Sequence, residues 1–174
     1  MTRMTRIAAL DDALPGDAAA LLRSCCGAER WVHAMVGERP FETLDTLLAV
    51  ADEQWWALTP ADWLEAFAHH PRIGERVGER AQDERGAAWS AEEQAGASAA
   101  SDDVRHALAH ANAAYEARFG YVYIVSAAGK RGDELAALAI ERLTNDPDTE
   151  LHVAAEEQRK ITRLRLERLF GEDA

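Results

Sequence analysis

His70 is the first of three residues whose surroundings suit proton transfer or anion binding. It follows Trp63 by seven residues and Phe67 by three, so a helix here would place its imidazole on the apolar face. That helix must end near His70, because Pro71 disfavours helical geometry in the residue before it. The helix dipole favours the protonated imidazolium there, whereas burial opposes it. His70 is therefore a candidate general acid/base, and the alternative is a histidine that caps the last carbonyls.

Glu93 is the second candidate, and its spacing from Ser90 has two interpretations. Ser90 and Glu93 have the spacing of a capping box, in which both side chains close the first turn of a helix. The sequence therefore predicts a short helix that begins near Ser90. A helix N-terminus also presents backbone N–H groups to polar or anionic ligands. The Glu93 carboxylate is thus either a structural cap or part of a binding site.

Arg165 is the third candidate, because it interrupts an apolar stripe. Its neighbours four residues away on the predicted last helix are Ile161 and Leu169. In one interpretation the stem packs against the core and the guanidinium reaches water. If the guanidinium is instead buried, it needs an anionic or carbonyl partner, because an unpaired buried charge is very costly.

Metal-binding patterns are weak in this chain. His106 and His110 have the i, i+4 spacing of ligands on a helix. At about 100° per residue, however, both lie opposite the apolar stripe of their helix, so we predict that they are exposed and bind no metal. Cys25 and Cys26, the only cysteines, are adjacent and provide neither a disulfide framework nor metal-ligand spacing.

Helices must position these candidates, because helical periodicity dominates the chain. Helices are predicted at about 17–23, 28–36, 42–57, 60–70, 101–119, 131–143 and 147–170. Residues 72–100 lack apolar periodicity outside the short helix expected near Ser90. A stretch of this length without clear pattern is typical of functional or mobile segments.

Residues 120–129 are rich in β-branched and aromatic side chains and locally resemble a strand. No partner strand is evident, and a lone strand is not stable. We therefore predict an extended segment near residues 120–128, buried between helices. Its backbone groups then need other partners, among them a polar ligand. The predicted fold class is all-α, a single-domain helical bundle over residues 1–174 that buries this one extended segment.

Size and charge exclude several classes of protein. A chain of 174 residues suits one domain, and its formal net charge of −12 argues against a nucleic-acid-binding surface. No run approaches the roughly 18 apolar residues of a membrane span, and the N-terminus lacks the apolar core of a secretory signal. We expect a cytoplasmic protein that binds neither nucleic acid nor a membrane.

Four stretches carry distinctive combinations of residues. They are Ala-His-His-Pro-Arg-Ile-Gly (68–74), Trp-Ser-Ala-Glu-Glu-Gln-Ala-Gly (89–96), Arg-Phe-Gly-Tyr-Val-Tyr-Ile-Val-Ser-Ala-Ala-Gly-Lys (118–130), and a stretch from Asn-Asp-Pro-Asp-Thr-Glu-Leu to Leu-Arg-Leu (145–166). In this order and at these separations they resemble the decarboxylases of 2-oxo-4-hydroxy-4-carboxy-5-ureidoimidazoline (OHCU). The resemblance runs from about Leu10 to Phe170. Any one motif is weak, but four in register are specific.

The resemblance implies an all-α, cofactor-independent carboxy-lyase, usually a homodimer, that converts OHCU to S-allantoin in urate (purine) catabolism. It implies His70 as the catalytic histidine, because Pro71 must follow it, together with Glu93 and Arg165 as catalytic residues. The residues it implies for binding the small-molecule substrate are Pro71, Ser90, Gln94, Tyr123, Ile124, Val125, Ser126 and Ala127. No metal or cofactor is implied. A second imidazole, His69, directly precedes the motif.

Two other functions are open at this point. The first is a metal-dependent hydrolase that uses His69, His70 and a nearby carboxylate. The second is a non-catalytic helical interaction module in which the motif residues are structural. Decarboxylation itself requires neither metal nor pyridoxal if the substrate ring accepts the electron pair left by carbon dioxide. It requires fixed orientation, stabilisation of the developing charge, and protonation from one face.

Overall fold

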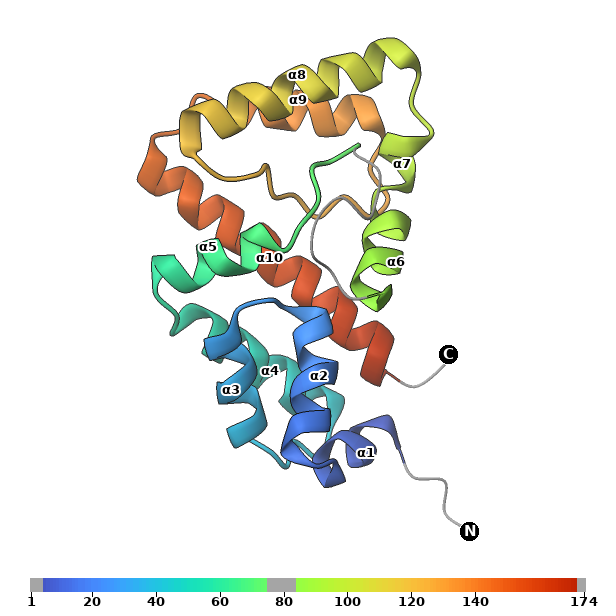
Figure 1. Cartoon of the computed structure of the whole chain (residues 1–174), viewed down its shortest axis with the longest axis vertical. Coiled ribbons are helices and arrows are strands. Elements are labelled where there is room, and N and C mark those ends of the chain that lie inside the picture. The colour runs from blue at the N-terminus through green and yellow to red at the C-terminus, as the bar shows by residue number, and fades with distance from the viewer. Residues whose placement is uncertain (1–4, 75–83, 172–174) are drawn as a thin grey trace. The chain divides into compact units, whose positions relative to one another are not determined.

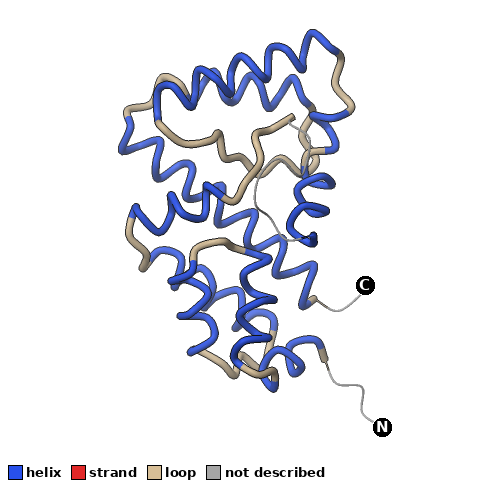
Figure 2. The backbone as a smooth tube through the Cα atoms, in the orientation of Figure 1, coloured by secondary structure: helices blue, strands red, loops and turns tan. Residues whose placement is uncertain are grey.

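The computed structural model describes residues 5–74 and 84–171, in which every regular element is an α-helix (Figure 2). The helices are α1 (Arg6–Asp12), α2 (Pro15–Cys25), α3 (Glu29–Gly37), α4 (Leu44–Trp56), α5 (Pro60–Ala68), α6 (Glu84–Glu93), α7 (Ala95–Ser98), α8 (Asp102–Phe119), α9 (Gly132–Arg142) and α10 (Pro147–Phe170). The prediction of an all-α fold is confirmed. The chain divides into two compact units, one from residues 1–65 with 159–174 and one from 66–158, and each is described by itself.

The first unit contains α1 to α4. Apart from α1, which no apolar periodicity predicts, these helices lie where the periodicity places them. The core is formed by large side chains that are almost fully buried, among them Leu10, Leu22, Trp31, Met35 and Trp55. The indole N–H of Trp31 donates to the Ala51 carbonyl at 3.1 Å and so ties α3 to α4. Thr43 caps α4 by accepting a hydrogen bond from the backbone N–H of Thr46 at 3.1 Å.

The second unit is built around α8 and α9, which lie side by side (Figure 1). The apolar periodicity of residues 101–119 predicts a buried stripe that includes Ala107, Leu108, Ala111 and Tyr115. On α8 Leu108, Ala111 and Tyr115 are buried, as predicted, whereas Ala107 is exposed. Gly120 ends this helix with φ 82°, a left-handed conformation that glycine adopts without a steric penalty. The chain then turns into residues 121–127, which contain no regular secondary structure.

This extended segment is the feature that the sequence predicted between the helices, and the prediction is confirmed (Figure 2). Its buried residues are Val122, Tyr123, Ile124, Val125 and Ala127, each at most 4% exposed. No strand lies among the described residues, so no backbone ladder pairs with it. Its hydrogen-bond partners must come from side chains and turns.

The prediction of a helix beginning at Ser90 is wrong, because α6 already starts at Glu84 and ends at Glu93. The backbone N–H of Gln94 donates to the Ser90 carbonyl at 3.1 Å, a bond that belongs to the last turn of a helix. A Ser-x-x-Glu spacing is local and fits the end of a helix as readily as its start. Residues 75–83, part of the aperiodic stretch, lie outside the described residues.

Candidate active site

His70 lies just beyond the end of α5, as the proline that follows it predicts. It is 9% exposed, whereas His69 is exposed, so His70 carries the imidazole that points inward. Its Nε2 lies 2.6 Å from Oε1 of Gln158, a residue with no exposed surface on α10. Because a carboxamide oxygen can only accept, Nε2 carries the proton and the neutral ring then has its lone pair on Nδ1. Gln158 therefore fixes the orientation and the tautomer of His70.

The turn after His70 is held by side chains from two other elements. The Asn112 carboxamide on α8 donates to the Ile73 carbonyl at 2.8 Å, and Oε1 of Gln94 accepts from the Gly74 N–H at 3.1 Å. Gly74 has φ 88°, which favours glycine at this position. Two of the four distinctive stretches, 68–74 and 89–96, are thus brought together. Part of Gln94 is used to hold the backbone that follows Pro71.

Ser90, Glu93 and Gln94 lie at the C-terminal end of α6 and just beyond it, and are 2%, 7% and 6% exposed. The capping-box alternative for Glu93 is wrong, because the helix ends where that alternative requires it to begin. A helix C-terminus carries a partial negative charge, so it does not favour a carboxylate. The burial of Glu93 at this end of the helix therefore fits a functional carboxylate better than a structural cap.

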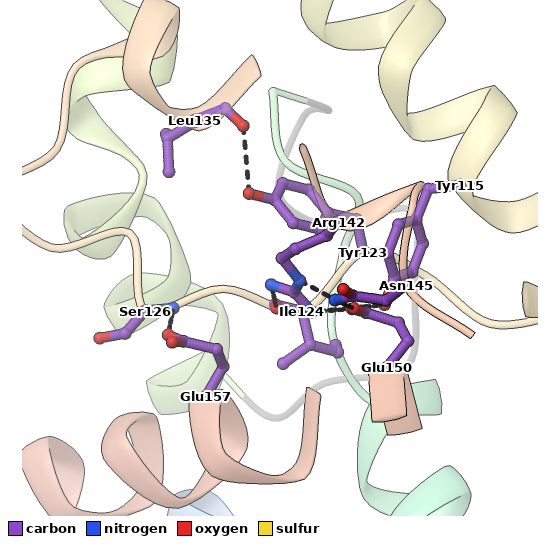
Figure 3. Close-up of polar contacts among 9 residues, drawn as sticks. All are labelled: Tyr115, Tyr123, Ile124, Ser126, Leu135, Arg142, Asn145, Glu150 and Glu157. Atoms are coloured by element: carbon purple, nitrogen blue, oxygen red, sulfur yellow. Dashed lines mark hydrogen bonds and ion pairs between the residues drawn. The ribbon is translucent and has the colours of Figure 1, made fainter. Parts of the chain in front are cut away.

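Side chains take the place of a partner strand along the extended segment (Figure 3). Arg142 Nη1 donates to the Ile124 carbonyl at 2.6 Å. The Ser126 N–H donates to a carboxylate oxygen of Glu157 at 2.8 Å, and the Ser126 carbonyl accepts from Lys130 Nζ at 2.7 Å. These contacts fix the path of the backbone from residue 124 to residue 126.

Five buried backbone N–H groups of the segment have no hydrogen-bond partner within the described part of the chain. They belong to residues that are each at most 4% exposed, namely Val122, Tyr123, Ile124, Val125 and Ala127. Buried backbone donors are almost always paired, with protein, water or a ligand. The arrangement supplies a short row of donors suited to carbonyl or anionic oxygens.

A buried polar cluster supports the segment, and its residues were not identified from sequence. Glu150 has no exposed surface, and its carboxylate accepts hydrogen bonds from Arg142, Asn145 and the Tyr115 hydroxyl. Burial is the main cause that raises the pKa of Tyr115 above its usual value, so the phenol stays protonated and donates. The sequence could have identified Arg142 as a buried charge, since it lies three residues after Ala139 on the apolar face of α9.

Arg165 belongs to the first unit, on the last part of α10. It is 5% exposed, so the alternative in which its guanidinium reaches water is wrong. Burial raises the pKa of the Cys26 thiol to about 11, while Arg165 acts in the opposite direction and favours the thiolate. Arg165 is therefore a buried positive charge whose field acts on this thiol.

The described residues show no arrangement typical of a metal site or a membrane span. His106 and His110 are exposed on α8, as predicted. Among the residues that the structure describes, no group of three or more His, Cys, Asp or Glu side chains is arranged to hold a metal ion. No helix in the described ranges is both long and apolar enough to cross a membrane.

Comparison with known proteins identifies relatives of this chain. The uric acid degradation bifunctional protein TTL of Arabidopsis thaliana is 31% identical over 150 residues, which cover 86% of this chain and 46% of that protein. The uric acid degradation bifunctional protein of Bacillus sp. (strain TB-90) is 29% identical over 136 residues, or 77% of this chain and 26% of that protein. The chain thus spans less than half the length of these two curated relatives.

Solved structures with the same fold are also known. A crystal structure of OHCU decarboxylase in the presence of (S)-allantoin superposes with a TM-score of 0.74 at 31% identity, covering 86% of this chain and 96% of that one. A crystal structure of (S)-allantoin synthase shares the fold, with a TM-score of 0.69 at 16% identity over 94% of this chain and 54% of that one. The family model described as OHCU decarboxylase matches residues 12–167. The chain therefore belongs to the OHCU decarboxylase family.

Proposed function

We propose that this protein catalyses the decarboxylation of OHCU to S-allantoin in the breakdown of urate. The family match over residues 12–167 supports this activity, as does the likeness to an OHCU decarboxylase crystallised with (S)-allantoin. The observation that carries the proposal is that a buried, oriented imidazole and a row of buried backbone donors lie in the same compact unit, at His70 and residues 124–127.

The reaction breaks the bond between the ring carbon and the departing carboxylate. Carbon dioxide leaves the carbon that also bears the hydroxyl, and the electron pair is delocalised into the neighbouring C=N unit of the ring. The adjacent carbon, which bears the ureido group, is then protonated from one face, while the hydroxyl loses its proton and becomes the ring carbonyl of allantoin. His70 is the general acid/base in this scheme. Because Gln158 holds Nε2–H, the Nδ1 atom of His70 is the one that exchanges the proton. Delivery of the proton from one fixed face accounts for a single enantiomer of the product.

The other site residues bind and orient. Glu93 holds the ureido N–H groups of the substrate, and the N–H groups of Val125 and Ala127 donate to ring oxygens on which negative charge grows. The resemblance assigns a catalytic role to Arg165, which is the stabilisation of developing negative charge rather than tight binding of the departing carboxylate, since such binding would stabilise the ground state over the transition state. Pro71, Ser90, Gln94 and Tyr123 line the substrate.

We propose in addition that the chain acts as one domain, as a cofactor-independent homodimer, and in the cytoplasm. The resemblance in the four distinctive stretches supports the homodimer and the independence from cofactors, and the net charge of −12 fits a small-molecule partner rather than nucleic acid. Light scattering coupled to size-exclusion chromatography tests the dimer. Turnover that survives exhaustive chelation tests the independence from metal and rejects a metal-dependent hydrolase.

The decisive experiment generates OHCU in situ from urate and follows allantoin by circular dichroism. The wild-type protein should produce enantiopure S-allantoin faster than the substrate decays unaided. His70→Gln should abolish this gain, while His69→Gln, which changes the exposed neighbour, should retain it. A His70→Gln protein with wild-type turnover would refute the assignment, and a wild-type protein that does not accelerate the reaction would refute the function and favour a non-catalytic module.

A further inference from the structure

Arg142 and Glu150 form an ion pair in the interior of the second unit. Arg142 is 8% exposed and Glu150 has no exposed surface, and Nε of the arginine donates to Oε1 of the glutamate at 2.7 Å. Buried ion pairs of this kind add little net stability, because removing both charges from water offsets their attraction. Fold stability alone is therefore a weak explanation for the pair.

The guanidinium of Arg142 is fixed in one orientation. While Nε faces Glu150, Nη1 donates to the Ile124 carbonyl at 2.6 Å, and Nη2 lies 3.3 Å from the hydroxyl of Tyr115 (Figure 3). Its central carbon lies 5.6 Å from the ring centroid of Tyr115 and 5.0 Å from that of Tyr123. A planar group with these partners cannot turn without breaking several contacts.

A fixed Ile124 carbonyl also fixes the N–H of Val125. The two belong to one planar trans peptide, so the N–H points away from the oxygen that Arg142 holds. A cation on the oxygen draws electron density from the peptide and makes its N–H a stronger donor. This N–H is one of the buried donors that have no partner among the described residues.

The next peptide is fixed from its other end. Glu157 accepts the hydrogen bond of the Ser126 N–H at 2.8 Å, so the peptide that joins Val125 to Ser126 is held as well. Val125 therefore lies between two oriented peptides, one held by a cation at its oxygen and one by a carboxylate at its nitrogen. Both side chains come from helices, α9 and α10.

We propose that Arg142, oriented by Glu150, is a positioning residue that aims and polarises the N–H of Val125 toward the oxygen of the substrate on which negative charge develops. The proposal rests on the proposed function for the identity of the substrate. It adds to that function two side chains that act through the backbone without touching the substrate. Their removal should affect the transition state more than substrate binding.

The first test measures the peptide itself and does not depend on activity. The double variant Arg142→Met/Glu150→Gln removes both charges while the new carboxamide can still accept the Tyr115 hydroxyl, so we expect it to fold. In ¹⁵N–¹H correlation spectra, the Val125 ¹⁵N resonance should move upfield, because its peptide oxygen has lost the cation. An unchanged Val125 resonance in a folded variant would overturn the proposal. If the double variant does not fold, Arg142→Gln/Glu150→Gln, which also removes both charges, replaces it in the same measurement.

The second test measures turnover. In the folded variant we expect kcat for S-allantoin formation to fall about 10- to 100-fold, while KM changes less than about threefold. This fall in kcat is smaller than the one expected if the hydrogen-bond donor itself were removed, because the Val125 N–H is still present. Arg142→Lys keeps the positive charge but lacks the planar guanidinium with its several fixed donors, so its kcat should lie between those of the double variant and the wild type. The control is Leu22→Ala, a core change in the first unit, which lowers thermal stability without touching this cluster. A variant with kcat equal to that of this control would refute the positioning role, whereas a wild-type protein without turnover would refute only the proposed function.

Discussion

Gly96 allows a close approach of two backbones that a single methyl group would prevent. A Cβ added at Gly96 on α7 would lie 2.0 Å from the Lys130 carbonyl oxygen and 3.0 Å from its carbonyl carbon. The Cα of Arg131 would be 3.3 Å away. All three atoms are backbone, so no side chain can rotate to make room. Gly96→Ala must therefore displace the turn that follows the extended segment.

The magnitude follows from two opposing effects. Alanine stabilises a helical position by about 0.5–1 kcal/mol relative to glycine. Overpacking against a rigid neighbour costs about 1–3 kcal/mol, and a contact with backbone lies at the upper end of that range. The net loss is about 2 kcal/mol, which corresponds to a fall in Tm of roughly 4–8 °C for a chain of this size.

Gly16→Ala is the matched control, because nothing lies within 4 Å of its added Cβ and it is also helical. The free energy of unfolding of this variant should equal that of the wild type or exceed it by up to about 1 kcal/mol. Tm is measured by circular dichroism at 222 nm, and S-allantoin formation is measured on the same samples. Gly96→Ala should also lose turnover, since Lys130 Nζ holds the Ser126 carbonyl at 2.7 Å. A Gly96→Ala protein as stable and active as Gly16→Ala would refute the reasoning.

Three further outcomes are expected. Glu93→Gln keeps the shape of the side chain but removes its charge, so kinetic assays should show turnover reduced at least about 100-fold, with Tm within a few degrees of wild type. Burial raises the pKa of Cys26 from 9.0 to about 11, so the folded protein holds a proton that the unfolded chain loses. Cys26 should therefore lower the free energy of unfolding by about 2 kcal/mol as the pH rises from 9 to 11, and urea titrations of Cys26→Ala should show a fall that is smaller by this amount. Thr43→Ala removes the cap of α4 and should lower the free energy of unfolding by about 1 kcal/mol in urea titrations. Wild-type turnover in Glu93→Gln would contradict the first prediction. The second would be contradicted by a pH dependence of stability in Cys26→Ala equal to that of the wild type, and the third by an unchanged urea midpoint in Thr43→Ala.

The helices could be predicted because their signals are local. Apolar side chains three and four residues apart marked α4 and α8, and Pro71 marked the end of α5. The short α1 was missed, since seven residues carry too few apolar positions to show a period. The spacing of Ser90 and Glu93 predicted the start of a helix, but these residues form the last turn of α6. The spacing describes a single turn and does not distinguish the first turn of a helix from the last.

The candidate site was predictable only in part. His70 and Glu93 were singled out from spacing, and their burial agrees with a functional role. The partners of the extended segment come from residues 18 and 31 positions later in the chain, Arg142 and Glu157, and no local pattern links such distant positions. An arginine on the buried face of a helix is a detectable signal, but only the fold reveals which carbonyl it serves.

The extended segment also has a consequence for how the chain behaves when it opens. Tyr121 to Val125 form an uncharged run of β-branched and aromatic residues without proline or glycine, the composition of segments that stack into intermolecular sheets. In the folded protein, Arg142 and Glu157 occupy backbone groups that another copy would otherwise bind. A chain in which α9 and α10 have come away exposes that run to its neighbours, so aggregation should compete with refolding as the protein concentration rises. The side chains that orient the segment in the native state thus also protect the protein from self-association.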